Sequence, residues 1–425
     1  MSPRTLRLTE NTFRSLRTRN FRLFFGGQLI SQVGNWLTMI AQTLLVLKLT
    51  DGGLALGILT ACQFAPLLLL GAWSGLVADR SDKRKLLLVV QTLAMVQSFA
   101  LAALAFTDDP PLLGLYALAL VGGLTVAFDN PARRAFVVEM VEEEDVQNAV
   151  SLNTAVMTGS RIVGPALAGL LVTTVGYGWA FLGDGLSYIA VLAALWRMDT
   201  TQLRVAPVQP RGRGQIREGL RYIRSVPELR IPLLMMTVVG TLGFNFQVVI
   251  PLFVTDTLAG DDRAFTLLFS VLSAGSFVGA LVAARRKTID LRAVALACAG
   301  FGAALSVMAA APSLVAAFPV AILVGFTGVA FMTTSTSIMQ LRASPVMRGR
   351  VLALQAMVFL GSTPIGGPVL GWLCDLTSPR VGLLVGGVAT LGAAAWGLST
   401  ARSSAPPVAD EEARLEPSAV GLHAG

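Results

Sequence analysis

Long apolar stretches alternate with short polar links along most of the chain. A helix needs about 20 mostly apolar residues to cross the hydrocarbon core of a bilayer, and twelve stretches qualify. They cover residues 21–47, 53–78, 86–106, 111–130, 148–173, 177–197, 231–255, 264–284, 291–310, 313–339, 351–375 and 381–399. Because lipid offers no hydrogen-bond partner to an open sheet edge, we predict that all twelve are helices. The expected fold is an all-α polytopic membrane protein.

The longest polar link divides the twelve predicted transmembrane helices into two sets of six. It is rich in Arg and Pro, and its second half mixes Arg with apolar residues at helical spacing, which predicts an amphipathic helix on the inner membrane surface. We expect five regions: a cytoplasmic N-terminal tail (1–20), an N-terminal six-helix bundle (21–197), a cytoplasmic linker (198–229), a C-terminal six-helix bundle (230–400) and a disordered tail (401–425).

Two short motifs recur in the second set of spans at nearly the same offset. Gly164-Pro165 recurs as Gly367-Pro368, 203 residues later, and Gly75 recurs as Gly279, 204 residues later. Chance similarity among Gly-rich and Ala-rich helices is the alternative. We predict two pseudo-symmetric bundles with a path for a small molecule between them.

Composition and charge support a membrane location. Hydrophobic residues make up 54% of the chain and charged residues 14%, against about 25% charged in soluble domains. With the N-terminus in the cytoplasm, all but four of the 33 Lys and Arg fall on the cytoplasmic side, which predicts that both termini are cytoplasmic. These cations form short clusters between spans, so the net charge of +8 does not indicate nucleic-acid binding. We expect a multi-pass protein of a bacterial-type inner membrane.

The residues available for chemistry are few. Cys62, Cys298 and Cys374 lie in or beside apolar spans without metal-ligand spacing, and the only histidine is His423 in the C-terminal tail. These observations argue against a metal centre and histidine-dependent catalysis. The chain also lacks the Gly-x4-Gly-Lys-Ser/Thr loop that would bind ATP phosphates. We expect no cofactor and no enzymatic activity.

A polar loop between two apolar spans carries a recognisable motif. Gly75-x-x-x-Asp79-Arg80, followed by a basic cluster, resembles the loop between helices 2 and 3 of major facilitator superfamily transporters. The resemblance covers about residues 14–400. The stretches 130–136 and 159–165 look like the branch of bacterial siderophore exporters and related efflux proteins. The span 111–130 contains no arginine, whereas proton-coupled drug antiporters of the superfamily typically carry a buried one in this helix.

The resemblance implies alternating access, in which a central site opens to one face and then to the other. The implied gating residues are Gly75, Asp79, Arg80, Lys83 and Arg84. We expect Asp79 to sit at the N-terminal end of the eleventh span, near Val351, when the cytoplasmic side is closed. Arg80 and Arg84 would then meet carboxylates of the 139–145 loop. The alternative is a solvated turn that only fixes topology.

Polar residues inside the spans are candidates for the substrate cavity. Gln28, Gln32, Asn35 and Gln42 share one helical face, and the seventh span offers Thr241, Asn245 and Gln247. The alternative is that these amides bond neighbouring helices. Arg161 lies near the middle of its span, so we expect it to bind substrate or take part in coupling, with a structural ion pair to Asp184 as the alternative. Asp184 and Asp129 are the candidates for proton binding.

Glycine and proline residues mark a predicted packing surface between the bundles. Its members are Gly159, Gly164, Pro165, Gly169, Gly367 and Pro368. Small side chains let helices approach closely, and proline loosens the backbone, so this surface predicts a rocking interface. Ordinary tight helix packing is the alternative.

The combined expectation is a secondary active transporter. We predict export of an amphiphilic, drug-like or siderophore-like small molecule, driven by protons, by a monomer in the lipid bilayer. A transporter that flips lysophospholipid between leaflets is one alternative. A non-transporting membrane scaffold or a membrane enzyme is the other.

Overall fold

A computed structural model describes residues 12–204, 215–284, 289–345 and 347–403. Most of the predicted tail at 401–425, and residues 1–11 of the predicted N-terminal tail, lie outside these ranges. The described chain is helical and has no strand, and twelve of its helical segments are long and apolar enough to cross a membrane. The all-α polytopic fold is therefore confirmed.

The first six membrane-length helices are α2 (Arg19–Thr50), α3 (Gly53–Arg80), α4 (Lys83–Ala105), α5 (Leu112–Glu139), α6 (Val146–Thr174) and α7 (Tyr177–Trp196). The second six are α9 (Pro227–Leu242) continued by α10 (Phe246–Leu252) and the π-helical η4 (Phe253–Thr257), then α11 (Asp262–Ala284), α12 (Leu291–Ala309), α13 (Leu314–Arg342), α14 (Arg348–Leu376) and α15 (Pro379–Ser403). Shorter helices are η1 (Arg14–Arg17), η2 (Glu143–Asp145), η3 (Thr200–Gln202) and α8 (Gln215–Ser225).

The helices form two bundles whose internal packing repeats. In the first bundle α3 packs on α5 and α4 packs on α7, and the corresponding helices of the second bundle pair in the same way, α11 on α13 and α12 on α15. The contacts between bundles are also related by exchange, because α3 packs on α14 while α11 packs on α6. This pattern is the one expected of a pseudo-twofold axis between two six-helix bundles, as predicted.

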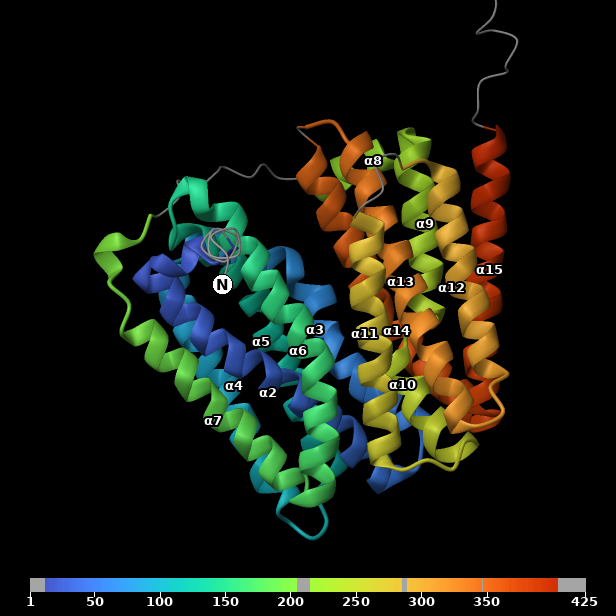
Figure 1. Ribbon diagram of the computed structural model, residues 1–425, viewed down its shortest axis with the longest axis horizontal. Coiled ribbons are helices and arrows are strands. Elements are labelled where there is room, and N and C mark those ends of the chain that lie inside the picture. The colour runs from blue at the N-terminus through green and yellow to red at the C-terminus, as the bar shows by residue number, and fades with distance from the viewer. Residues whose placement is uncertain (1–11, 205–214, 285–288, 346, 404–425) are drawn as a thin grey trace, which may run out of the picture.

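The two bundles meet at one end of the molecule and diverge toward the other, the end that carries α8 (Figure 1). We call these ends the opposite face and the α8 face. At the opposite face, the start of α3 lies against the end of α14 without intervening side chains. A Cβ atom on Gly57 would lie 2.6 Å from the carbonyl oxygen of Gly367, and one on Gly53 would lie 2.6 Å from that of Gly371. Glycine is required here for backbone-to-backbone contact.

Two predicted spans differ from the helices that form. The seventh span is not continuous, because α9 ends at Leu242 and α10 begins at Phe246, with Gly243 and Asn245 in the break. The fourth span was predicted to end at residue 130, but α5 continues to Glu139. Hydropathy ends a span at the first cluster of charges, whereas helical hydrogen bonding continues through charged residues that find partners.

Polar contacts fasten the first bundle together at the α8 face. Asn20 of α2 donates a hydrogen bond to the backbone oxygen of Asp199, 2.8 Å away, and the backbone N–H of Asp199 returns one to Asn20. Side-chain and backbone hydrogen bonds from Thr201 hold the pKa of Asp199 below its usual range. Arg14 pairs with Asp145 at the start of α6. The N-terminal segment and the segment after α7 are thereby attached to the first bundle.

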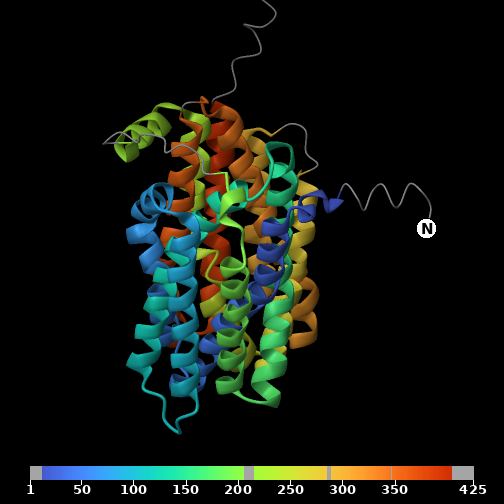
Figure 2. The same ribbon diagram turned by 90° about the vertical axis from the view of Figure 1, so that its left-hand side faces the viewer.

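The predicted amphipathic helix forms as α8 and packs against the second bundle (Figure 2). Glu218 forms an ion pair of 2.6 Å with Arg350 of α14. The hydroxyl of Tyr222 accepts a hydrogen bond of 3.0 Å from the backbone N–H of Ser344. Ile223 is buried. One face of α8 therefore docks on protein, so only the remaining face is available to a membrane surface.

Candidate functional site

Arg161 of α6 lies where the two bundles meet. Its guanidinium carbon is 5.6 Å from the ring centroid of Trp36 on α2, and Trp36 packs in turn against Phe269 of α11, with ring centroids 6.3 Å apart. A Cβ atom on Gly164 would overlap the side chain of Trp36, so this glycine allows the indole to lie against α6. The row of Arg161, Trp36 and Phe269 connects the first bundle to the second.

The charge of Arg161 has no acidic partner in the part of the chain that the structure describes. Its Nε atom is buried and makes no hydrogen bond. Asp184, the alternative partner, binds hydroxyl groups instead: Thr38 donates to Oδ2 at 2.6 Å, and Ser98 donates to Oδ2 at 2.7 Å. The alternative of an ion pair between Arg161 and Asp184 is therefore wrong.

The amides of α2 point into the first bundle. Gln28, Gln32 and Gln42 are 2%, 7% and 2% exposed, whereas Leu29 and Ile30 are 50% and 55% exposed. Gln42 donates a hydrogen bond to the backbone oxygen of Leu115 on α5, 3.0 Å away. At 3.6 residues per turn, Leu29 lies about 100° and Ile30 about 200° around the helix from Gln28. This placement matches the alternative in which amides bond neighbouring helices.

Asn35 shares the polar face of α2 with these glutamines and directly precedes Trp36, the residue that contacts Arg161. Its side-chain oxygen accepts a hydrogen bond of 2.7 Å from the hydroxyl of Tyr188 on α7, and it is partly exposed. The contact orients Asn35 and fixes α2 against α7 one residue before Trp36.

A second buried network centres on Arg133 of α5, which is only 4% exposed. Arg133 forms an ion pair of 2.8 Å with Asp129 and donates to the amide oxygen of Gln28 at 3.2 Å. Gln91 of α4 donates to the other oxygen of Asp129 at 2.7 Å. The prediction that the fourth helix lacks a buried arginine is therefore wrong, because it rested on a span that ended at residue 130.

The predicted residues of the seventh span line the break between α9 and α10. Thr241 bonds its own helix, Gln247 lies 3.0 Å from the sulfur of Met39 on α2, and Asn245 is buried with its oxygen unpaired. Gln247 is therefore the only one of the three for which a contact with the first bundle is described.

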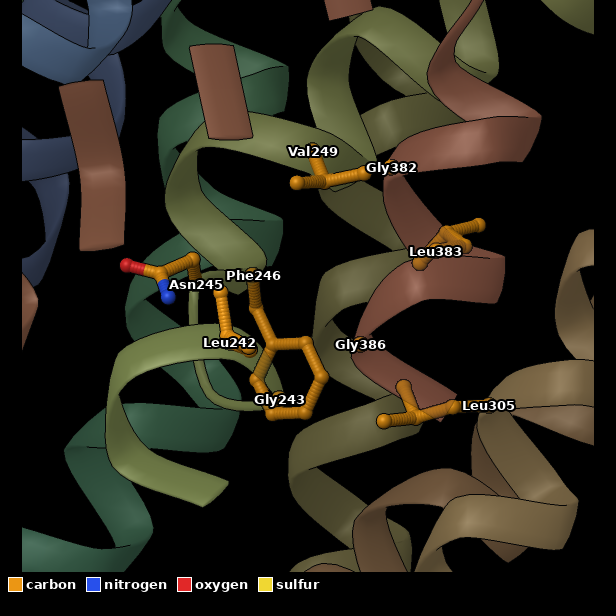
Figure 3. Close-up of a pocket in the computed structure, with 9 residues that line it drawn as sticks. All are labelled: Leu242, Gly243, Asn245, Phe246, Val249, Leu305, Gly382, Leu383 and Gly386. Carbon is orange, nitrogen blue, oxygen red and sulfur yellow. The ribbon is translucent and has the colours of Figure 1, made fainter. Parts of the chain in front are cut away.

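A small pocket lies beside the break (Figure 3). It is lined by Leu242, Gly243, Asn245, Phe246, Val249, Leu305, Gly382, Leu383 and Gly386. In Figure 3 the amide of Asn245 is directed away from Leu305 and Leu383, so apolar groups face the pocket. Phe244, which lies in the break itself, packs against Phe301 with tilted rings and against Phe359 edge to face, at centroid distances of 4.8 and 5.0 Å. The seventh span is thus held by aromatic packing around a non-helical segment.

Comparison with known proteins assigns the family. The family described as transmembrane secretion effector matches residues 10–419. The chain belongs to this family. Its fold matches a bacterial homologue of the human lysosomal transporter Spinster, solved in an inward-facing, unoccupied conformation, with a TM-score of 0.72 at 14% identity over 91% of this chain and 97% of that one. The family match places the chain among transporters of the major facilitator type rather than enzymes. The structural match shows that it shares the fold of such a transporter.

Two sequence relatives are efflux or siderophore transporters. The staphyloferrin A transporter of Staphylococcus aureus is 24% identical over 264 residues, which cover 61% of this chain and 66% of the relative, just under two thirds of its length. The multidrug efflux pump Tap of Mycolicibacterium fortuitum is 26% identical over 366 residues, which cover 82% of this chain and 87% of Tap.

In this structure, two basic residues of the predicted gating loop contact the ends of α5 and α7. Lys83 forms a buried ion pair of 2.9 Å with Glu139 at the end of α5. In this state, in which the bundles diverge at the α8 face, Arg84 donates hydrogen bonds to the backbone oxygens of Leu195 and Trp196 at the end of α7. The contact expected between Arg84 and the 139–145 loop when that side is closed stays a prediction. Arg80 is exposed. Gly75 and Asp79 are half-buried near the end of α3, and their predicted part in gating stays a prediction.

The residues of the predicted glycine-proline surface fall into three groups by what lies next to them. Gly169 faces Thr266 of α11, and Gly367 with Pro368 faces Gly57 of α3, so these residues lie between the bundles. Gly164 and Pro165 are buried in α6, where Gly164 faces Trp36 of its own bundle. Gly159 has nothing within 4 Å of a Cβ position. Gly169, Gly367 and Pro368 therefore lie between the bundles, and their part in a rocking movement stays a prediction.

Trp36 and Asp375 take part in the contacts between bundles and were not predicted. Asp375 of α14 accepts hydrogen bonds from the backbone N–H groups of Gly53, at 2.5 Å, and Leu54, at 2.8 Å, at the start of α3. The sequence offers a signal for Asp375, a carboxylate at the end of a span whose partner helix starts with Gly52-Gly53. Trp36 carries no comparable signal, because aromatic residues are frequent in membrane helices.

Proposed function

We propose that this protein exports an amphiphilic small molecule with an anionic group, by alternating access across the inner membrane. The observation that carries the proposal is Arg161, a cation in the middle of α6 without an acidic partner among the described residues, beside the aromatic ring of Trp36. A charge at this depth is unfavourable unless it is paired. A substrate carboxylate, sulfonate or phosphate would supply the missing partner, and Trp36 would bind an adjacent apolar surface.

The arrangement of the bundles supports a direction for transport. The Lys and Arg residues gather at the α8 face, which we therefore assign to the cytoplasm together with both termini. The contacts of α3 with α14, and of α6 with α11, bring the bundles together at the opposite face. In this state a substrate would enter from the cytoplasm and be released outside after the bundles rock. Similarity to the multidrug efflux pump Tap supports the same direction.

The two bundles would need an energy source to move substrate against a gradient. The sequence offers no nucleotide-binding loop, so we propose exchange for protons. Binding of an anion at Arg161 would also change the surroundings of Trp36, whose contact with Phe269 joins the bundles. Substrate binding and bundle movement would thereby be linked through a single row of side chains.

The test measures transport by the purified full-length chain in proteoliposomes. The probes are taurocholate, an amphiphilic anion, and ethidium, an amphiphilic cation. We expect Arg161→Gln to lower taurocholate transport by about tenfold or more, because a hydrogen bond to a charged group is lost. Arg161→Lys should keep part of the activity. Arg134→Gln, at an exposed arginine of α5, is the control and should behave as wild type.

Three outcomes would contradict the proposal. Unchanged taurocholate transport by Arg161→Gln would exclude Arg161 as the anion-binding group. Ethidium transport that exceeds taurocholate transport and ignores Arg161 would indicate a cation exporter. Movement of a fluorescent lysophospholipid between leaflets, without transport of either probe across the membrane, would favour the lysophospholipid alternative.

A further inference from the structure

Asp184 of α7 occupies a cage of hydroxyl groups in the interior of the first bundle. The carboxyl group is 1% exposed and is contacted by three helices. Thr38 of α2 and Ser98 of α4 both donate to Oδ2, at 2.6 and 2.7 Å, while the nearest described partner of Oδ1 is the hydroxyl of Ser187, at 3.4 Å. The two carboxylate oxygens are therefore unequal, because Oδ2 accepts two short hydrogen bonds and Oδ1 accepts a single long one.

The backbone of α2 lies directly beside the less occupied oxygen. Gly34 of α2 faces Asp184, and a Cβ atom at this position would overlap Oδ1 and lie 2.8 Å from the hydroxyl oxygen of Ser187. Among the described residues, Oδ1 accepts only the long hydrogen bond from Ser187, so a proton added to this oxygen would replace no short hydrogen bond.

Nothing described in the surrounding helices neutralises Asp184. The charged residues of α2 are Arg19, Arg22 and Lys48, near its ends, and those of α4 are confined to positions 83–85. The other ionisable groups of α7 are the phenols of Tyr177 and Tyr188. On α5, the buried cation Arg133 is already paired with Asp129. In the described chain, Asp184 forms no ion pair.

We infer that Asp184 binds the transported proton at Oδ1, and that Asp129 does not. This inference rests on the proposed function, because it assigns the coupling ion to a site within the same transporter. Asp129 forms an ion pair with Arg133 and accepts a hydrogen bond from Gln91, so a proton on Asp129 would have to displace a buried cation. Asp184 has hydroxyl donors for its charged form and, in Oδ1, an oxygen without a short hydrogen bond that can take the proton. In the described chain it has no cationic partner that would be left unpaired when its charge is removed.

The bonds around Asp184 give protonation a route to the bundle interface. Hydrogen bonds to an ionised carboxylate are about twice as strong as those to a neutral group, so protonation weakens the bonds from Thr38 and Ser98. Thr38 lies two residues after Trp36 on α2, and Trp36 contacts both Arg161 and Phe269. Weaker bonds from Thr38 and Ser98 loosen the packing of α7 on α2 and on α4. Because α2 carries Trp36, a change in its packing reaches the Arg161–Trp36–Phe269 row.

The first test is infrared difference spectroscopy of the purified full-length chain during a pH titration. We expect a protonated carboxyl band that appears as the pH falls, persists in Asp129→Asn and is absent from Asp184→Asn. In Ser98→Ala the band should move to higher frequency, because the carbonyl oxygen Oδ2 loses one of its two donors. A band that persists in Asp184→Asn, or that disappears only in Asp129→Asn, would overturn the assignment.

The second test separates coupling from substrate movement. Asp184→Asn should still exchange labelled for unlabelled taurocholate across proteoliposomes, but should lose accumulation driven by a pH gradient. Accumulation that persists in Asp184→Asn would exclude this residue as the coupling site. A wild-type protein that moves no taurocholate would contradict the proposed function, while the infrared titration would still decide where the proton binds. If Asp184→Asn is unfolded by its melting temperature, Ser98→Ala carries the spectroscopic test.

Discussion

The contact of Asp375 with the start of α3 predicts that this side chain stabilises the closed opposite face. Both carboxylate oxygens accept hydrogen bonds from free N–H groups of a helix N-terminus, those of Gly53 and Leu54. A capping side chain contributes about 1 kcal/mol, and the attraction of a negative charge to the helix dipole adds about 0.3–1 kcal/mol at an exposed position. Asp375 is exposed, so the lower part of this range applies.

Replacing Asp375 with Ala should therefore shift the balance between closed and open states by about 1–1.5 kcal/mol, or about five- to tenfold, toward opening. Asp375→Asn keeps one acceptor oxygen and should produce a smaller shift. The assay is double electron–electron resonance between spin labels at Asp109→Cys and Ala310→Cys, exposed positions at the opposite face on either bundle. The three native cysteines are replaced by Ala.

We expect a longer-distance population that grows from Asp375→Asn to Asp375→Ala. The control is Asp256→Asn, an exposed carboxylate at the same face whose described partner is the hydroxyl of Thr255 in its own segment. Identical distance distributions in wild type and Asp375→Ala would refute the reasoning. A control that opens as far as Asp375→Ala would show that general loss of negative charge, and not the contact with α3, is responsible.

Two further predictions concern the bundle that carries the gating loop and the surface between bundles. Lys83→Ala should lower the free energy of unfolding by about 3–5 kcal/mol, because it leaves the buried Glu139 without its partner. Replacing both residues with Met should recover most of this loss. An unchanged melting temperature of Lys83→Ala would contradict the prediction. Gly169→Leu should block closure of the opposite face by colliding with Thr266, whereas Gly159→Leu, where nothing lies within 4 Å, should transport taurocholate normally. Equal activity of the two leucine variants would exclude Gly169 from the interface.

The number, type and order of the membrane helices could be predicted from the sequence, because the bilayer imposes a length and a polarity on every span. The boundaries could not be predicted equally well. Arg133 was excluded from the fourth span because a charged residue ends a hydropathy window, but Asp129 pairs with it and the helix continues to Glu139. A charge inside a membrane helix is visible in the sequence, whereas its partner is visible only in the fold.

The sequence also could not predict which way the polar face of α2 points. The spacing of Gln28, Gln32 and Gln42 correctly places them on one face of α2, but a helix can be rotated about its axis without changing that spacing. Partners on α5, such as Leu115 and Arg133, determine the rotation. The prediction for Arg161 depends less on this rotation, because a cation in mid-span needs a partner whichever way the helix faces.

The segment between the two bundles limits how far they can separate. Arg204 is held to the first bundle through a backbone hydrogen bond to Glu139 and an ion pair with Glu142, and α8, which begins at Gln215, is held to the second by Arg350. Eleven peptide units join these two anchors, and a fully extended chain of that length reaches about 40 Å. This segment limits the width of the opening at the α8 face, so we expect that shortening it would restrict opening on that side and leave opening of the opposite face unaffected.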